Sequence, residues 1–263
     1  MPLNLPFSQK LLNKLATSGA TEYELESSAN EDLELFLELL YSQGLELKQQ
    51  DGRYFFSTNF IPLDSAEFCI VDIETNGSKL EKHQIIEIAA LKVQNNKVVD
   101  RFETFVECDC INEHITRITG ISTEQTKNAP KIDTVLREFR KFLGSAVFVA
   151  HDVKFDYMFI SGSMEKLGLG ILQNQTLCSI DLAERTLSSY RYGLEYLNAC
   201  FNLYPEAKHH RAMSDVITTY KLLERSLQTL NDFENPPKTV GELLLFAKQS
   251  NRLKRPKFDP LGV

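Results

Sequence analysis

The sequence predicts an α/β protein in which helices cover both faces of a mixed sheet, preceded by a small module of three helices and a hairpin. Two observations predict the larger part: apolar strand patterns come first as a meander, and a later strand pattern alternates with helices. A third observation, N-cap residues ahead of short apolar periods near the start, predicts the module. With 263 residues, the chain is longer than a typical domain, so we expect one domain with additions.

The first module is expected over residues 1–62. Ser8 and Thr21 are favoured N-cap residues, and glycine commonly ends a helix, as Gly44 is expected to do. Three short helices are therefore predicted, over residues 8–16, 21–28 and 30–42. A hairpin should follow over residues 45–57, because the sequence Gln50-Asp-Gly52 at its centre is typical of a turn. Three short helices followed by a hairpin resemble a winged-helix module.

Charge argues against the usual DNA-reading role of such a module. Residues 1–65 carry four Lys and Arg against ten Asp and Glu, a net charge of −6 out of −7 for the whole chain. The third helix would present Glu31, Asp32, Glu34 and Glu38 to phosphate groups. We therefore favour a protein-docking or purely structural role for this module.

The second domain is expected over residues 66–230, after a linker marked by Pro62 and Asp64. Its strands are predicted by short runs rich in branched apolar residues, at 68–74, 84–94, 97–106 and 146–150. Its helices are predicted by 3.6-residue periodicity, at 131–143, 153–167, 180–187, 194–201 and 211–230. Residues 231–263 are expected to form a short helix at 239–249 and then a basic tail.

Composition limits the setting in which the protein works. No uninterrupted apolar run of about 18 residues is present, and the first residues lack the pattern of a signal peptide. The five cysteines include no CxxC pair, which argues against a disulfide framework or a structural zinc site. A cytoplasmic location is the simplest expectation.

Two carboxylates in an apolar strand are the first candidates for metal-binding or catalytic residues. Asp72 and Glu74 are two residues apart, so strand alternation directs both side chains to one side of the sheet. Burial and mutual repulsion would raise their pKa values, and a divalent cation would allow both to remain ionised. A purely structural alternative, in which one of them caps the following turn, explains Glu74 better than Asp72.

Two further acids occupy comparable positions. Asp156 follows the predicted strand 146–150 closely, so it should lie near the carboxyl edge of the sheet, where binding sites collect. Asp215 lies in the first turn of the last long helix, and His210 precedes it by five residues. Five residues rotate a helix by about 500°, so the two side chains cannot share a helix face, and His210 is expected on the preceding loop.

These three motifs in this order resemble those of the DEDDh, or DnaQ-like, exonucleases, and among them the proofreading epsilon subunits of bacterial DNA polymerase III. The motifs are Asp72-Ile-Glu74-Thr75, the segment His151 to Asp156, and His210-x4-Asp215. Two supporting strings agree, Ile85-Ile-Glu-Ile-Ala89 and Ile118-Thr-Gly-Ile-Ser122. The resemblance covers roughly residues 66–228 and implies a ribonuclease H-like fold that hydrolyses nucleotides from a 3′ end.

The resemblance also implies roles for individual residues. Asp72, Glu74, Asp156 and Asp215 would hold two Mg²⁺ or Mn²⁺ ions, and His210 would be the general base. Thr75, Asp152 and Phe155 would contact the substrate. His209 is a rival base, but only His210 has the family spacing to Asp215. His151 is expected to be structural.

One position departs from the family pattern. Asp152 stands where the family usually has Asn, and a carboxylate only accepts hydrogen bonds and adds negative charge near the substrate backbone. The expected substrate is DNA with a free 3′ end, and the expected partners are DNA polymerase III core subunits. RNA trimming is the nearer alternative, since the catalytic acids do not read the 2′-hydroxyl. A non-catalytic replisome scaffold is the alternative from another class.

Overall fold

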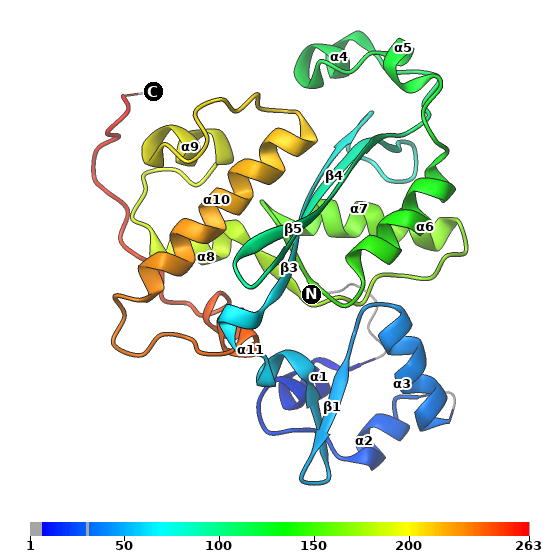
Figure 1. The fold of residues 1–263 in the computed structure, drawn as a ribbon, viewed down its shortest axis with the longest axis vertical. Coiled ribbons are helices and arrows are strands. Elements are labelled where there is room, and N and C mark those ends of the chain that lie inside the picture. Colours follow the sequence, from blue (N-terminus) through cyan, green and yellow to red (C-terminus); the bar gives the residue numbers. More distant parts are fainter. Residues whose placement is uncertain (1–6, 30–31, 263) are drawn as a thin grey trace.

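The computed structural model describes residues 7–29 and 32–262 (Figure 1). The expectation that the third helix begins at Asn30 with Glu31 in its first turn lies outside the described residues. No helix in the described part of the chain has the length and apolar character needed to cross a membrane. All five cysteines fall within the described ranges, and each is a free thiol.

The N-terminal elements follow the predicted order of three helices and a hairpin: α1 (Gln9–Ala16), α2 (Glu22–Glu26), α3 (Leu33–Ser42), β1 (Leu47–Gln50) and β2 (Arg53–Phe56). Ser8 caps α1 by accepting a hydrogen bond from the Leu11 N–H, and Thr21 forms a capping box with Glu24. Between β1 and β2, Asp51 and Gly52 both have positive φ, which a two-residue hairpin turn requires.

These elements enclose an apolar cluster of their own, which includes Leu15, Leu25 and Leu40. Two short 3-10 helices, η1 (Ser57–Phe60) and η2 (Leu63–Ser65), then lead to the main sheet. Direct hydrogen bonds join the two parts: the Thr58 hydroxyl donates to Gln175 Oε1 at 2.6 Å, and the Gln173 N–H donates to the Gln43 carbonyl at 2.8 Å.

The main sheet has five strands in the order β5-β4-β3-β6-β7. The strands are β3 (Glu67–Thr75), β4 (Ile85–Gln94), β5 (Lys97–Phe105), β6 (Val147–Ala150) and β7 (Thr176–Cys178). β3, β4 and β5 form the predicted antiparallel meander, whereas β6 and β7 lie parallel to β3, so the sheet is mixed as expected. The sequence reading missed β7, which is only three residues long.

Helices cover both faces of this sheet (Figure 1). On one face lie α8 (Ser179–Thr186), α10 (Ala212–Leu230) and α11 (Val240–Phe246), which pack on Phe68 and Ile70 of β3. On the other face lie α6 (Ile132–Leu143) and α7 (Val153–Lys166), which pack on Cys69 and Val71. Successive residues of β3 thus enter opposite cores, as strand alternation requires. Three more helices complete the chain: α4 (Glu113–Thr119), α5 (Thr123–Thr126) and α9 (Leu194–Phe201).

The basic tail folds back onto the chain beside α9 and α10 (Figure 1). Glu184 of α8 is only 5% exposed, and its carboxylate pairs with Arg252 at 2.9 Å and with Arg255 at 3.0 Å. The Leu253 N–H donates to the Glu184 carbonyl, and the Ser188 hydroxyl donates to the Lys254 carbonyl. Two of the basic residues of the tail therefore neutralise a buried acid of the same chain.

Candidate active site

Asp72 and Glu74 lie at the carboxyl end of β3. They continue the row of Phe68 and Ile70, so both side chains face the side of the sheet that α10 covers. The register places Glu74 directly opposite Glu87 of β4. Three carboxylates therefore project from two neighbouring strands on one side of the sheet.

Asp156 reaches the same edge of the sheet from α7. This helix begins three residues after β6, and Asp156 lies in its first turn with only 4% of its surface exposed. Its Oδ1 accepts a hydrogen bond from the backbone N–H of Ile73 at 3.1 Å. This bond fixes the carboxylate beside the strand between Asp72 and Glu74.

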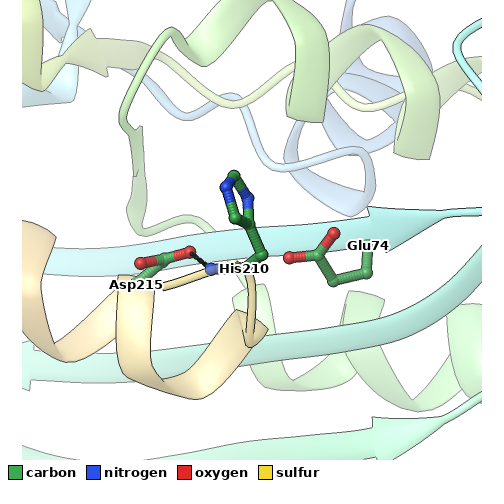
Figure 2. Close-up of side chains that lie close together, drawn as sticks. All are labelled: Glu74, His210 and Asp215. Carbon is green, nitrogen blue, oxygen red and sulfur yellow. Dashed lines mark hydrogen bonds between the residues drawn. The ribbon is translucent and has the colours of Figure 1, made fainter. Parts of the chain in front are cut away.

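Asp215 and His210 are supplied by α10 and the loop before it. Asp215 lies in the first turn of the helix, and its Oδ2 accepts the backbone N–H of His210 at 2.9 Å. His210 lies outside the helix, where the helix geometry placed it, and its φ of 61° is uncommon for a residue other than glycine. The His210 ring is exposed and stands between the carboxylates of Asp215 and Glu74 (Figure 2).

Glu74, His210 and Asp215 form the tightest group in the site. One potential ligand atom from each lies within 4.8 Å of those of the other two, a spacing that could hold a metal ion. These side chains come from β3, a loop and α10, so only the folded chain brings them together. Asp72 and Asp156 lie outside this group of three but interact with it through their charges.

Burial raises the pKa values of all four acids, and repulsion from the other acids adds to the shift for Asp72 and Glu74. The pKa of Asp72 lies well above its usual range, first because of desolvation and then because of Asp156, Glu74 and Asp215. Burial raises the pKa of Glu74 and that of Asp156 to about 8. Burial also raises the pKa of Asp215, although the bond from the His210 N–H opposes the shift. This cluster therefore needs either protons or cations to be stable.

The two neighbouring histidines have different surroundings. His209 is half-buried, and its Nδ1 lies 3.3 Å from Asp215 Oδ1, so Asp215 already engages its ring. The exposed His210 ring is free to meet an incoming molecule. His151 contacts the Ser179 hydroxyl at 2.8 Å and the Tyr192 carbonyl at 2.9 Å, and burial lowers its pKa to about 4. His151 is therefore a neutral residue in a structural position.

Thr75 and Phe155, expected to contact substrate, lie next to site acids in the chain, and the charge of Asp152 acts on Asp156. Thr75 ends β3 immediately after Glu74. Asp152 is the N-cap of α7 but makes no side-chain capping bond, and its φ of 64° places it in the left-handed region. Asn and Asp both tolerate that conformation, so the departure from the family residue preserves the backbone geometry. Phe155 follows in the first turn of α7, with its ring partly exposed.

Glu87 is a residue of the site that the sequence reading missed. It is 1% exposed, accepts the Ala212 backbone N–H at 3.1 Å and binds the Arg211 guanidinium at 3.0 Å. Arg211 directly follows His210, so this pair fixes the start of α10 and the loop that carries the histidine. The available signal was a single charged residue within the apolar string Ile85 to Ala89.

The comparison with protein families identifies the class. Residues 69–223, which include every acid of the site, match the family RNase_T, described as "Exonuclease". The match covers more than half of the chain. The chain therefore belongs to this exonuclease family, a group of metal-dependent hydrolytic nucleases, and the family resemblance seen in the sequence motifs is confirmed.

Curated relatives include DNA polymerases of one type. The chain is 37% identical over 172 residues to the PolC-type DNA polymerase III of Halalkalibacterium halodurans, covering 64% of this chain and 12% of that protein. It is 38% identical over 168 residues to the same type of polymerase from Caldanaerobacter subterraneus subsp. tengcongensis, covering 63% of this chain and 12% of that protein. The chain thus spans about an eighth of the length of these relatives.

Solved structures share the fold. Exonuclease X, solved in complex with 5′-overhanging duplex DNA, superposes with a TM-score of 0.52 at 24% identity, over 67% of this chain and 99% of that one. Escherichia coli exonuclease I, in complex with a dT13 oligonucleotide, superposes with a TM-score of 0.55 at 16% identity, over 64% and 43% of the two chains. These likenesses confirm the expected mixed α/β fold.

The position of Glu87 generates a first prediction. Glu87→Gln should weaken the bond to Arg211 and loosen the loop that carries His210, lowering kcat about tenfold or more, because small misplacements of a catalytic group are costly. KM should change much less, since the substituted group does not contact the substrate. Steady-state kinetics on a labelled oligonucleotide would measure both quantities.

A matched control is Glu67→Gln. Glu67 begins β3, at the end of the strand opposite to Glu74, and its carboxylate pairs with Lys92 of β4. The substitution should leave kcat unchanged. If Glu67→Gln and Glu87→Gln reduced kcat equally, or if Glu87→Gln raised only KM, the positioning role would be wrong.

The raised pKa values generate a second prediction. The folded protein holds protons on Glu74 and Asp156 up to about pH 8, whereas the unfolded chain releases them near its ordinary carboxyl pKa values. The free energy of unfolding without metal should therefore fall as the pH rises through this window. A divalent cation should reverse the loss, so the rise in Tm caused by Mg²⁺ should be larger at the alkaline end of the window.

Calorimetric melting with EDTA and with Mg²⁺ at several pH values tests this prediction. Asp72→Asn with Glu74→Gln should flatten both dependences, because it removes two of the interacting charges. A Tm shift with Mg²⁺ that is independent of pH would contradict the assignment.

Proposed function

We propose that the chain is a 3′→5′ exonuclease that hydrolyses nucleotides from DNA 3′ ends with the help of two divalent cations. The observation that carries the proposal is the convergence of Glu74, His210 and Asp215 within 4.8 Å, beside Asp72 and Asp156. Five groups of this chemistry at one edge of the sheet match the needs of phosphodiester hydrolysis.

The four carboxylates fit divalent cations. Mg²⁺ and Mn²⁺ prefer oxygen ligands, and this donor set consists of four acids whose pKa values are raised, first of all by burial. Asp72, Glu74, Asp156 and Asp215 would hold the ions. When bound, two such ions stabilise the entering and leaving oxygens of an in-line displacement at phosphorus.

His210 is the group we assign to proton transfer. Its ring is exposed and lies beside Glu74 and Asp215, so it can accept the proton of the attacking water. The bond from its own N–H to Asp215 Oδ2 fixes the backbone from which the ring projects. His209 instead turns its ring to Asp215 and supports that carboxylate.

Thr75, Phe155 and Asp152 are the residues we assign to substrate contact. Thr75 directly follows Glu74 and would line the sugar of the terminal nucleotide. The partly exposed Phe155 ring offers a surface on which a base can stack, an interaction that is independent of sequence. Asp152 adds negative charge at the start of α7, where the strand backbone would pass.

The expected setting is DNA proofreading in the cytoplasm, beside the core subunits of DNA polymerase III. Support comes from the PolC-type polymerases, which share this domain at 37% and 38% identity. The net charge of −7 agrees with an enzyme that binds DNA weakly by itself and depends on a partner for sustained contact.

A nuclease assay tests the reaction and the base. With Mg²⁺, the protein should release nucleotides from 3′-labelled single-stranded DNA, and EDTA should abolish release. His210→Ala should lower kcat by about 10² to 10⁴, the usual contribution of a general base. Asp72→Asn should lower kcat by orders of magnitude, and the exposed His114→Ala serves as the control that leaves kcat unchanged.

Parallel substrates distinguish the alternatives. No metal-dependent release from DNA or RNA would reject the enzymatic role, and RNA degraded much faster than DNA would reject proofreading. Loss of label from a 5′-labelled strand before its 3′ end shortens would reject the direction.

Asp152 generates a separate prediction. Asp152→Asn restores an amide that can donate hydrogen bonds and removes one negative charge, while keeping a side chain that tolerates φ near 64°. KM for single-stranded DNA should fall about two- to tenfold at low salt, with a smaller effect at high salt because the charge is screened. An unchanged KM at both salt concentrations would show that residue 152 does not face the strand.

A further inference from the structure

A second concave site lies between the end of α3 and the end of α6. We call it the α3–α6 cleft; its walls are residues 41–44, the segment 137–145 and the segment 168–174. Its volume is about 660 Å³, within the range of pockets that enclose small ligands. Figure 1 shows that the end of α3 approaches the lower end of α6, the two helices next to which these walls lie.

The cleft is positively charged in an acidic protein. Arg137, Arg140 and Lys141 line it, and no carboxylate is among its described lining residues. The N-terminal elements carry most of the negative charge of the chain, yet they contribute only the uncharged residues 41–44 to this wall. This arrangement leaves a local positive field that favours an anionic ligand.

The three cations do not have the same role. The Arg140 guanidinium donates to the carbonyls of Gly170 and Ile171, both at 3.1 Å, and so holds the loop that forms one wall. Within the described part of the chain, no ion pair or side-chain hydrogen bond involves Arg137 or Lys141. They lie four residues apart on one helix face, where like charges repel each other slightly. The α6 dipole favours Lys141 in the last turn but does not explain Arg137, one turn earlier.

The rest of the lining is uncharged and includes apolar side chains beside the amides of Gln43 and Asn174. Leu143 and Leu172 are buried and Leu169 is half-buried, while Tyr41 is 60% exposed at the rim. Apolar side chains and an accessible aromatic ring suit a flat heterocycle, whereas the two unpaired cations suit phosphate groups. A ligand that combines both chemistries is a nucleotide.

The cleft is separate from the carboxylate site. Ile70 of β3 pairs with Val149 of β6, so the parallel register places Asp72 beside residue 151, just after the carboxyl end of β6. The cleft instead includes Ser145, which lies just before the amino end of β6. Six strand residues at about 3.3 Å each separate the two sites by roughly 20 Å along the strand direction.

We propose that the α3–α6 cleft binds a nucleotide, with Arg137 and Lys141 holding its phosphates and its base lying against Leu169 and Tyr41. The site does not depend on the proposed nuclease reaction. It would allow the concentration of free nucleotides to stabilise the contact between the N-terminal elements and α6, since both line the cleft.

Binding of dATP and dAMP to the full chain tests the proposal. Equilibrium dialysis in EDTA prevents metal-dependent binding at the carboxylate site. Arg137→Glu with Lys141→Glu should weaken dATP binding about tenfold or more, because it replaces two phosphate contacts by repulsion. Lys97→Glu with Lys127→Glu makes the same charge change at exposed positions outside the cleft and should leave binding within about twofold.

Ser145→Phe supplies a second variant, which fills the cleft without changing its charge and should also weaken binding. Melting curves confirm that each variant is folded, and nuclease activity should persist in both cleft variants. Absence of saturable dATP binding, equal binding by the two charge-reversed variants, or equally tight binding of inorganic triphosphate would overturn the proposal. Displacement of dATP by an acidic peptide at equal concentration would also overturn it, since the cleft would then select charge alone.

Discussion

The enforced proximity of acids at one edge of the sheet is the constraint on which the rest of the structure depends. Asp72 and Glu74 face the α10 side of β3, and Asp156 and Asp215 approach them from two helices. Burial raises the pKa of each of these carboxyl groups, and repulsion raises those of Asp72 and Glu74 further, so the arrangement costs free energy in the absence of cations. Two packed cores, one on each face of the sheet, hold these groups together against their repulsion.

Glu87 is a buried carboxylate of this region whose charge is compensated, and its contacts position neighbouring parts of the site. It is buried opposite Glu74, and it is compensated by the Arg211 guanidinium and by the Ala212 N–H at the start of α10. A carboxylate at a helix N-terminus is favourable because it satisfies a backbone donor and the helix dipole. The same contacts fix the loop of His210, so electrostatic compensation in β4 determines where the proposed base stands.

The two ends of the chain use their charge differently. The acidic N-terminal elements contribute only the uncharged residues 41–44 to the wall of the α3–α6 cleft, so Arg137 and Lys141 leave that cleft positively charged. The tail that the sequence predicted to be basic balances charge within the fold, because Arg252 and Arg255 bind the buried Glu184. Charge that stands out in the sequence of a terminus can therefore serve the internal balance of the fold.

The sequence by itself predicted most elements of the fold, though not β7, α4 or α5, and the proposed residues of the candidate site except Glu87. Period-two and period-3.6 patterns depend on local backbone geometry, so the meander, α6, α7 and α10 were all visible in it. Helix rotation alone also separated His210 from Asp215. Three features came only from the tertiary structure. Asp72 faces the side of the sheet that α10 covers, Asp215 contacts the His209 ring, and Glu87 binds the Arg211 guanidinium. These contacts join residues up to 124 positions apart, and no local pattern encodes which distant side chain compensates a buried charge.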